Sequence, residues 1–598
     1  MRKRKKRRSR LRPFLVGVIL ILIALISYEL FQRVTNPDRR RDWSRVIAYI
    51  PLDDRTDNWD DVIYAAEASG WELETPPVDW FRTALDGQPR NGNGTPYGNR
   101  EALFEWAREM GKSGCRYFIF SLDQLFSGGL VHSRTVRESW PLTFAKRQMS
   151  ELDAFRAYIL PLAKNRRNRV YLFDSLLRLS PTVGYQGIGE AEYYGLREYG
   201  MTARPTLSGD KLTLENIFSL YPYAADGRTP AEDALANDKF RDALTPELLE
   251  TYLHTRRRKL TLTDGILSAI DGADNIQLLI GVDDSSNQDN IQYNELRYLR
   301  SRVGDDVSSG VAVMPGLDSL ARLFVGRVAQ EVYDAHIRAS VRYIGGTEEN
   351  HSSEFDLHTL EEVVKLHLDF YRAEIVPESE AELQFLVMTA PDNPERAPEY
   401  VEELASALER NLSSGVPTVL NEASNDAYGD ALERTLLERV PFAGLVAYAG
   451  KYDQANVTGA AFAMGFSRYL YLRHGGGTLR ADSAQARQMA NSMALTEYIL
   501  NVRAPLNAYI QSLGVDTGNM PPDTPYREQI MEKFAELFAP ECEKVCENLR
   551  GTDLLCGVGP QSVRTVAAIS IEDYSFPWNR TFETAFAVNV ALTAARER

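Results

Sequence analysis

Aspartates stand at the ends of apolar segments in this sequence, and Asp123 shows the pattern most fully. It comes directly after residues 117–122, "YFIFSL", and Gly128, Gly129 and Arg134 follow in "DQLFSGGLVHSR". A charge at the end of a buried strand is costly unless it is paired or takes part in chemistry. Glycines let a backbone approach a ligand closely, and arginine binds planar anionic groups. The stretch therefore indicates a functional site.

The same combination recurs after other segments that are typical of buried strands. Its acids are Asp53 and Asp54 in "PLDDR", Asp174 in "LFDSLLR", Asp283 and Asp284 in "GVDDSSNQ" and Asp318 in "PGLDS", with Arg55 and Arg178 close by. Because the carboxyl ends of parallel strands meet at one edge of a sheet, we expect these side chains to share a cleft. Crowded carboxylates raise the pKa of at least one member, which supplies a protonated acid beside an ionised base.

Acid–base hydrolysis, including glycoside hydrolysis, needs such a pair of carboxyl groups. We assign the acid and base roles to Asp123 and to Asp283 or Asp284. The residues expected to bind substrate from this set are Asp53, Asp54, Arg55, Gly128, Gly129, Arg134, Arg178 and Asp318. Two alternatives stay open: each aspartate alone could cap the following helix, and the cluster could hold Mg²⁺ or Ca²⁺. We predict no other cofactor.

The elements that must position these side chains alternate along the chain from residue 45 onward. Short β-branched or aromatic segments are separated by amphipathic stretches, which predicts α/β lobes with mostly parallel sheets between helices. We expect one α/β domain over 45–325, a second over 326–480 and a mainly helical region over 481–598. The strand order stays open, so a barrel is an alternative to an open sheet. The expected strands are 46–52, 117–122, 169–174, 276–282, 310–315, 383–389, 416–421 and 444–450.

The N-terminal residues predict a membrane anchor. Residues 1–13 hold nine Lys or Arg and no acid, and 14–31 are apolar apart from Ser27, Tyr28 and Glu29. As a helix these 18 residues rise about 27 Å, close to the thickness of a bilayer core. The basic tail should stay in the cytoplasm, so that a linker over 32–44 leads to domains outside the cell membrane. A cleaved signal peptide is the alternative, although no small-x-small cleavage site follows the apolar run.

Charge and cysteine content narrow the class of partner. The chain holds 68 basic and 83 acidic residues, and beyond residue 13 its formal net charge is −24. Such a surface argues against nucleic acid, and it disfavours polyanionic substrates unless a local basic pocket receives them. Cys542, Cys546 and Cys556 lie within 15 residues of one another, so a local disulfide and buried free thiols are both open.

Six sequence blocks, in order, resemble those of DUF4127, a bacterial family of unknown function. They are "PLDDRT", "SLDQLFSGGLVHSR", "LLRLSPT", "DDSSNQ", "PGLDS" and "PWNRTFE". The resemblance covers nearly everything after the apolar segment. It implies that Asp123, Gly128, Gly129 and Arg134 are functional positions, because a helix cap alone does not call for the glycines and the arginine.

The chain also departs from that family's pattern. Thr56 replaces a proline and Ser319 replaces an acid. The block "YAGKYDQANVTG" keeps Tyr448 and Asn456 but has Lys-Tyr-Asp at 451–453, where the family pattern has Trp-Asn-Thr. The protein therefore resembles a divergent member, which would bind without turnover if the replaced residues are catalytic.

These observations together predict an anchored, extracytoplasmic hydrolase that acts on carbohydrate or other cell-envelope material. Tyr448 and Asn456 are expected to bind substrate from the second domain. A non-catalytic envelope protein that binds a glycan or a protein partner is the main alternative. A divalent-metal-dependent enzyme is the other.

Overall fold

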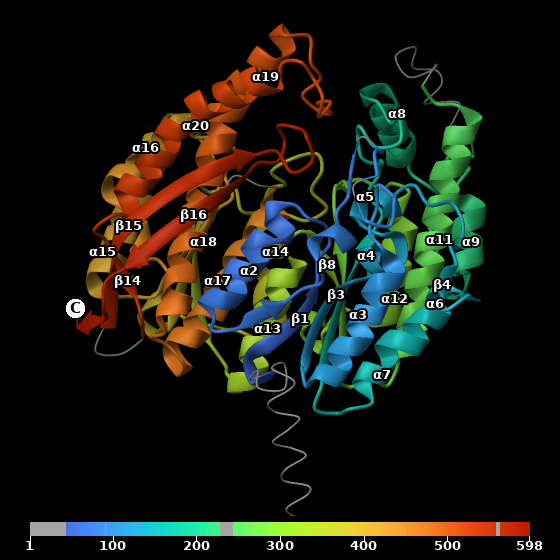
Figure 1. Cartoon of the computed structure of the whole chain (residues 1–598), viewed down its shortest axis with the longest axis horizontal. Coiled ribbons are helices and arrows are strands. Elements are labelled where there is room, and N and C mark those ends of the chain that lie inside the picture. The colour runs from blue at the N-terminus through green and yellow to red at the C-terminus, as the bar shows by residue number, and fades with distance from the viewer. Residues whose placement is uncertain are drawn as a thin grey trace, which may run out of the picture.

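The computed structural model describes residues 43–85, 87–89, 91–227, 243–450, 453–557 and 562–597 (Figure 1). The predicted basic tail over 1–13 and anchor over 14–31 lie outside these residues. Within the described ranges, no helix combines the length and the apolar character that a membrane span requires.

The first lobe is built on a six-stranded sheet in which every paired strand is parallel. The strand order is β2-β1-β3-β6-β7-β8, so the direction of winding reverses between β1 and β3. The bounds are β1 (Val46–Ile50), β2 (Glu72–Glu74), β3 (Tyr117–Ser121), β6 (Arg169–Leu176), β7 (Ile276–Val282) and β8 (Val311–Pro315). In doubly wound sheets, ligands bind outside the carboxyl ends of strands near such a reversal.

The second lobe repeats this arrangement with five parallel strands in the order β10-β9-β11-β12-β13. Their bounds are β9 (Arg338–Ile344), β10 (Glu374–Ile375), β11 (Leu383–Met388), β12 (Thr418–Glu422) and β13 (Ala447–Gly450). Both sheets are open, which decides against the barrel. The predicted α/β class with mostly parallel sheets is confirmed.

One hydrophobic core joins the two lobes. Apolar side chains from the inner faces of both sheets, such as Tyr49, Phe385 and Val419, pack around a shared helical layer. That layer consists of α2 (Asp60–Ala68), α13 (Leu320–Tyr333), α14 (Leu360–Phe370) and α17 (Gln454–His474). Figure 1 shows α2, α13, α14 and α17 beside strands β1 and β8 of the first sheet.

Two further helical layers cover the outer faces of the sheets. The first sheet carries α3 (Arg100–Ser113), α4 (Leu122–Ser127), α6 (Glu151–Ala154), α11 (Pro246–Ile270) and α12 (Gln292–Val303). The second carries α15 (Ala397–Ser414), α16 (Asp430–Arg439), α18 (Leu479–Glu497) and α20 (Arg527–Leu549). Other elements are β4 (Leu142–Phe144), β5 (Arg147–Met149), α5 (Leu130–Ser133), α7 (Leu160–Ala163), α8 (Glu190–Met201), α9 (Leu214–Leu220), a π-helix η11 (Tyr498–Val502) and α19 (Arg503–Ser512).

The C-terminal region holds helices, as expected, and also an antiparallel sheet that the sequence did not predict. After α18, α19 and α20 the chain ends in an antiparallel sheet of β14 (Asp553–Leu555), β15 (Ser562–Ser575), β16 (Ala585–Leu592) and β17 (Arg596–Glu597). Two register shifts interrupt the pairing of β15 with β16, and charged residues occupy its open face. An irregular, half-polar strand of this kind gives a weak sequence signal. All four cysteines are buried free thiols. Of the two alternatives for Cys542, Cys546 and Cys556, the structure therefore has the free thiols.

Candidate functional site

A cleft of about 740 Å³ lies where the carboxyl ends of the first sheet meet the second lobe and the C-terminal region. Its size is within the usual range for a small-molecule site. Its charged lining residues are Arg55, Asp57, Arg134, Arg178, Asp283, Asp284, Asp318, Arg322, Asp356, Asp426, Asp453, Arg503, Arg580 and Glu583. The cleft is therefore a local concentration of both charges on a protein that is acidic overall.

Two of the predicted aspartates pair with two of the predicted arginines across strand ends of the first sheet. Arg134 Nη2 lies 3.0 Å from Asp283 Oδ2, and Arg178 pairs with Asp284. Both acids follow β7, and Asp284 has a φ of +41°, a strained backbone conformation for a residue with a side chain. Strain of this kind persists only where the surroundings fix it, as they do at ligand sites.

Asp283 is a cleft acid whose pKa is raised by its surroundings. Burial, and then the neighbouring carboxylate of Asp284, raise the pKa of Asp283 to about 6, although Arg134 and Arg178 oppose the rise. The carboxyl group can therefore carry a proton near neutral pH. Burial together with the positive charge of Arg178 lowers the pKa of Arg134 to about 10, so this arginine stays charged.

Asp318 has the opposite electrostatic setting. Burial alone would raise its pKa, but Arg55 and Asn58 hold the pKa of this carboxyl below its usual value. Arg55 Nη2 lies 2.7 Å from Asp318 Oδ1, and Asn58 Nδ2 donates to the same oxygen at 2.9 Å. Asp53 lies behind Arg55 at 2.8 Å and is fully buried, so it fixes the arginine and does not itself line the cleft.

Asn456, from the first turn of α17, joins the second lobe to this arrangement. Its Oδ1 accepts hydrogen bonds from the backbone N–H groups of Leu317 and Asp318, both at 3.0 Å. Its Nδ2 donates to Asp453 Oδ2 at 2.8 Å. The predicted residue thus lines the cleft and fixes the loop that carries Asp318.

Asp453 is a cleft residue that was not among the predicted site residues. It caps α17 by accepting a hydrogen bond from the Asn456 backbone N–H at 3.0 Å. Burial, and then the carboxylate of Asp283, raise the pKa of Asp453 to about 7. The sequence did hold a signal for Asp453, because this acid stands where the family pattern has threonine.

The "PWNRTFE" block forms another wall of the cleft, although none of its residues was among the predicted site residues. Trp578 Nε1 donates to Asp54 Oδ1 at 2.9 Å, and the guanidinium of Arg55 lies 4.8 Å from the Trp578 ring centre. Asp54 therefore lies behind Trp578 and does not line the cleft. Burial raises the pKa of Asp54 to about 6 in spite of the Trp578 hydrogen bond. Asp57, whose pKa burial and Asp61 raise to about 7, is a further missed lining residue.

Asp123, which the sequence predicts to be catalytic, lies outside the cleft. Its side chain turns to the outer face of the sheet, where Lys259 Nζ on α11 lies 2.5 Å from its Oδ1. The same ammonium pairs with Asp174, and the Ser175 backbone N–H donates to Asp123 Oδ2 at 3.0 Å. Each oxygen of the Asp123 carboxylate thus has a partner inside the protein, and the side chain is fully buried.

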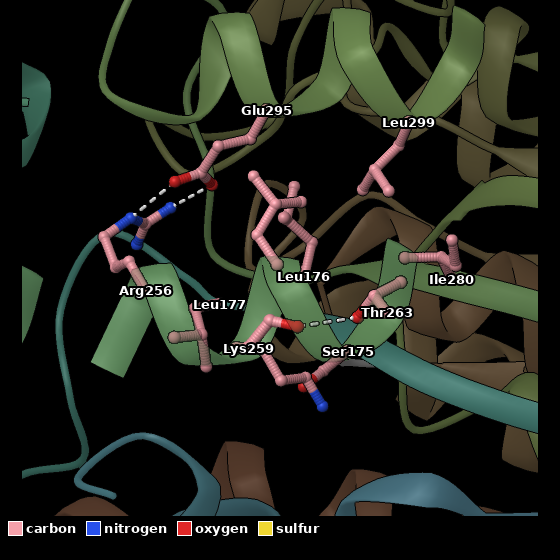
Figure 2. A pocket seen from close by; sticks show the side chains of 10 residues that line it. Ser175, Leu176, Leu177, Arg256, Lys259, Thr263, Ile280, Glu295 and Leu299 are labelled. Atoms are coloured by element: carbon pink, nitrogen blue, oxygen red, sulfur yellow. Dashed lines mark hydrogen bonds and ion pairs between the residues drawn. The ribbon is translucent and has the colours of Figure 1, made fainter. Parts of the chain in front are cut away.

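Figure 2 shows a small pocket beside Lys259, with Lys259 and Thr263 on α11. On the same helix Arg256 is directed at Glu295, and that second buried ion pair joins α11 to α12. The pocket in this view holds only about 10 Å³, about enough for one water molecule. It is therefore part of the packed interior and no ligand site.

Gly128, Gly129 and Tyr448 also lie outside the cleft lining. Gly128 has a φ of +76°, and a Cβ there would meet the backbone of Gly98 at 2.9 Å. The glycine pair therefore lets two loops pack closely, which leads the chain into α5 and Arg134. Tyr448 is buried, and its hydroxyl lies 3.1 Å from Thr496 Oγ1 in the core of the second lobe.

Arginines pair with four of the cleft acids, Asp283, Asp284, Asp318 and Glu583, and the Asn456 amide donates to Asp453. In the described ranges, no group of three or more histidine, cysteine or acidic side chains is arranged to hold a metal ion. The Mg²⁺ or Ca²⁺ alternative therefore gains no support from the positions of these side chains.

Fold and site together define a two-lobed α/β protein with a charged cleft at the carboxyl edge of a doubly wound sheet. The chain belongs to the DUF4127 family, whose profile, described as a protein of unknown function, matches residues 47–587. No curated protein and no solved structure matches the chain.

Proposed function

We propose that the protein is an acid–base hydrolase in which Asp283 is the general acid and Asp318 the general base. The observation that carries this proposal is the opposite shift of their pKa values within one cleft. Burial and Asp284 raise the pKa of Asp283 to about 6, whereas Arg55 and Asn58 hold that of Asp318 below its usual value. Pairs of carboxyl groups whose surroundings separate their pKa values are typical of acid–base catalysis.

In the proposed reaction the protonated Asp283 donates its proton to the leaving oxygen as the scissile bond breaks. Asp318 accepts a proton from water, whose hydroxide forms the new bond to the substrate carbon. Both groups then exchange protons with solvent and return to their starting states. Arg134 and Arg55 hold the two carboxyl groups in place, and Asn456 fixes the loop of Asp318.

We propose a carbohydrate or related cell-envelope compound as the substrate. Five aromatic side chains line the cleft among its charges: Tyr193, Phe355, Tyr498, Trp578 and Phe582. Aromatic rings offer apolar faces, and the intervening amides, carboxylates and guanidiniums offer hydrogen bonds to hydroxyl groups. A polyhydroxylated ring matches that mixture better than an apolar ligand does.

We also propose that the protein acts outside the cell membrane, anchored by residues 14–31. The support is the apolar run itself and the nine basic residues before it. Expression without residues 1–31 should move the protein from the membrane fraction to the soluble fraction. Protease added to intact cells should cleave only the full-length protein's outer domains. Equal fractionation of both forms would refute the anchor.

The catalytic proposal is tested with Asp283→Asn and Asp318→Asn in the full chain. Asp430→Asn, at an exposed surface position, is the matched control. The assay is release of new reducing ends from neutral and acidic oligosaccharides and from cell-wall material. Loss of a general acid or base lowers turnover by about 10²- to 10⁴-fold, and thermal unfolding should show that the variants remain folded.

Two results would contradict this proposal. Wild-type rates in both site variants would exclude the assigned roles. Saccharide binding by the wild-type protein without release of reducing ends from any substrate would favour the alternative of a glycan-binding protein. That result is expected if the residues replaced at 451–453 carried the activity.

A further inference from the structure

Arginines and aromatic rings alternate along one wall of the cleft. The guanidinium of Arg55 lies 4.8 Å from the ring centre of Trp578, and that of Arg580 lies 5.2 Å from the same ring centre. Arg580 is also 5.2 Å from Phe582, which Arg503 contacts in turn at 5.5 Å. The row runs from the acid–base residues outward, because Arg55 binds Asp318 while Phe582 is 64% exposed.

At the outer end of this row lies a positive charge that no carboxylate of the described residues pairs with within 4.0 Å. Of the six arginines lining the cleft, five pair with acids within 4.0 Å. Arg503 is the exception: among the described residues it has no ion pair, and its side chain makes no hydrogen bond. A guanidinium without a partner in a cleft is a ready-made site for a carboxylate, which it can bind through two parallel hydrogen bonds.

The surrounding backbone holds Arg503 and Phe582 in fixed positions. Arg503 follows the π-helix η11, a rare element that is often found at functional sites. Tyr498 in that helix donates its hydroxyl to Thr581 O at 2.6 Å, and the Thr581 N–H donates to Thr517 O at 3.2 Å. The π-helix and the loop of Phe582 are thus tied together next to the exposed ring.

We propose that Arg503 and Phe582 form a subsite for a carboxylated sugar residue, so that the cleft takes acidic oligosaccharides. The exposed ring offers a stacking face for the sugar, and the guanidinium beside it binds the carboxylate. This inference rests on the proposed function, because it takes the cleft to be the binding site of a saccharide chain. It also accounts for how a protein of net charge −15 receives an anionic ligand.

The test measures binding of oligogalacturonate and oligomannuronate to the full-length protein by calorimetry. Each probe is compared with its carboxyl-reduced, neutral copy of the same length. Binding is measured on the Asp283→Asn variant, so that hydrolysis does not consume the ligand. We expect an acidic probe to bind about tenfold or more tightly than its neutral copy, since a charge-assisted pair is typically worth that much.

Three variants locate the preference. Arg503→Gln should abolish the difference between acidic and neutral probes, whereas Arg503→Lys should keep part of it. Phe582→Ala should weaken the binding of acidic and neutral probes alike by about fivefold, because stacking does not depend on the carboxylate. Arg434→Gln removes an exposed arginine on α16 and is the control for loss of one positive charge.

The outcomes separate this inference from the proposed function. Equal binding of acidic and neutral probes, or an unchanged preference in Arg503→Gln, overturns the subsite and leaves the hydrolase proposal standing. Competition by millimolar inorganic phosphate as strong as that by the acidic probe also overturns it, because the site would then accept any anion. Absence of binding by all four probes overturns the subsite and removes the support for a saccharide substrate.

Discussion

Replacement of Lys259 by methionine should destabilise the first lobe strongly, because it removes the single cation between two buried carboxylates. The Lys259 side chain is 6% exposed, that of Asp123 is 0% exposed and that of Asp174 is 2% exposed. Methionine keeps most of the volume of the lysine stem, so the substitution changes charge far more than packing. The perturbation therefore tests whether Asp123 is a structural carboxylate.

The magnitude follows from the loss of one partner in a buried ion pair, which typically costs about 3–5 kcal/mol. Because the two lobes share one core, they should unfold together, and for a unit on the order of 500 residues the unfolding temperature shifts by only about 1 °C per kcal/mol, so at pH 7.5 it should fall by about 3–5 °C. In the wild-type protein burial already raises the pKa of Asp174, and Lys259 opposes that rise.

The pH dependence gives the sharper signature. Without Lys259, which lowers it, the folded-state pKa of Asp174 should lie further above its unfolded value. Such groups contribute stability at pH values below the unfolded pKa and lose it as pH rises through the folded pKa. The deficit of the variant should therefore shrink from pH 7.5 to pH 5, by up to about 1.4 kcal/mol per pH unit for each proton bound.

The assay is differential scanning calorimetry of wild type and variant at several pH values, with Lys365→Met as the control at a side chain that is 78% exposed. A variant within 1 °C of wild type at pH 7.5, or a deficit that does not change with pH, would refute the reasoning. A triple variant with Asp123→Asn and Asp174→Asn should recover part of the lost stability.

Three further predictions concern the cleft. Turnover should be highest between the depressed pKa of Asp318 and the pKa of Asp283 at about 6, and it should fall about tenfold per pH unit above that value; a flat profile from pH 5 to 8 would contradict the acid role. Asn456→Leu should leave the backbone N–H groups of Leu317 and Asp318 without their acceptor, which should lower the free energy of unfolding measured by calorimetry by about 2 kcal/mol and change kcat by a larger factor than KM. Asp453→Thr keeps a residue type that caps helices, so stability should change by less than about 1 kcal/mol, and because Asp453 is mostly protonated where Asp283 titrates, the alkaline limb of the Asp283 profile should stay near pH 6.

Much of the fold could be predicted because its central strands are continuous apolar runs between amphipathic helices. The segment 276–282 forms β7 with the same bounds, and 169–174 forms most of β6. The second lobe's β9, Arg338–Ile344, was missed because charges interrupt its apolar pattern. Arg342 pairs with Glu403, 2.6 Å away and 61 residues later in the sequence, so a half-buried residue of a parallel strand is charged. Local hydrophobicity carries no record of that placement.

The site residues were harder to predict. The carboxyl ends of the strands do converge, but the sequence does not show to which face of the sheet each side chain at a strand end is directed. Asp283 and Asp123 look alike in sequence, each following an apolar run. Their roles differ because Lys259, 136 residues after Asp123, supplies a buried partner on the outer face. The sequence around Asp123 does not predict that Lys259 will be its partner. The contacts of Trp578 with Arg55 and Asp54 join residues more than 500 positions apart, and these too depend on the tertiary fold.

The core shared by the two sheets has a mechanical consequence for the cleft. Proteins that close by a hinge have lobes with separate cores and a thin connection between them. In this protein, rotation of one lobe would pull α13 away from α17 and expose apolar side chains such as Phe324 and Phe462 to water. We therefore expect a stiff, preformed cavity that selects its ligand by fixed spacing and admits it through its open rim. Ligand binding should change the solution scattering profile of the protein very little.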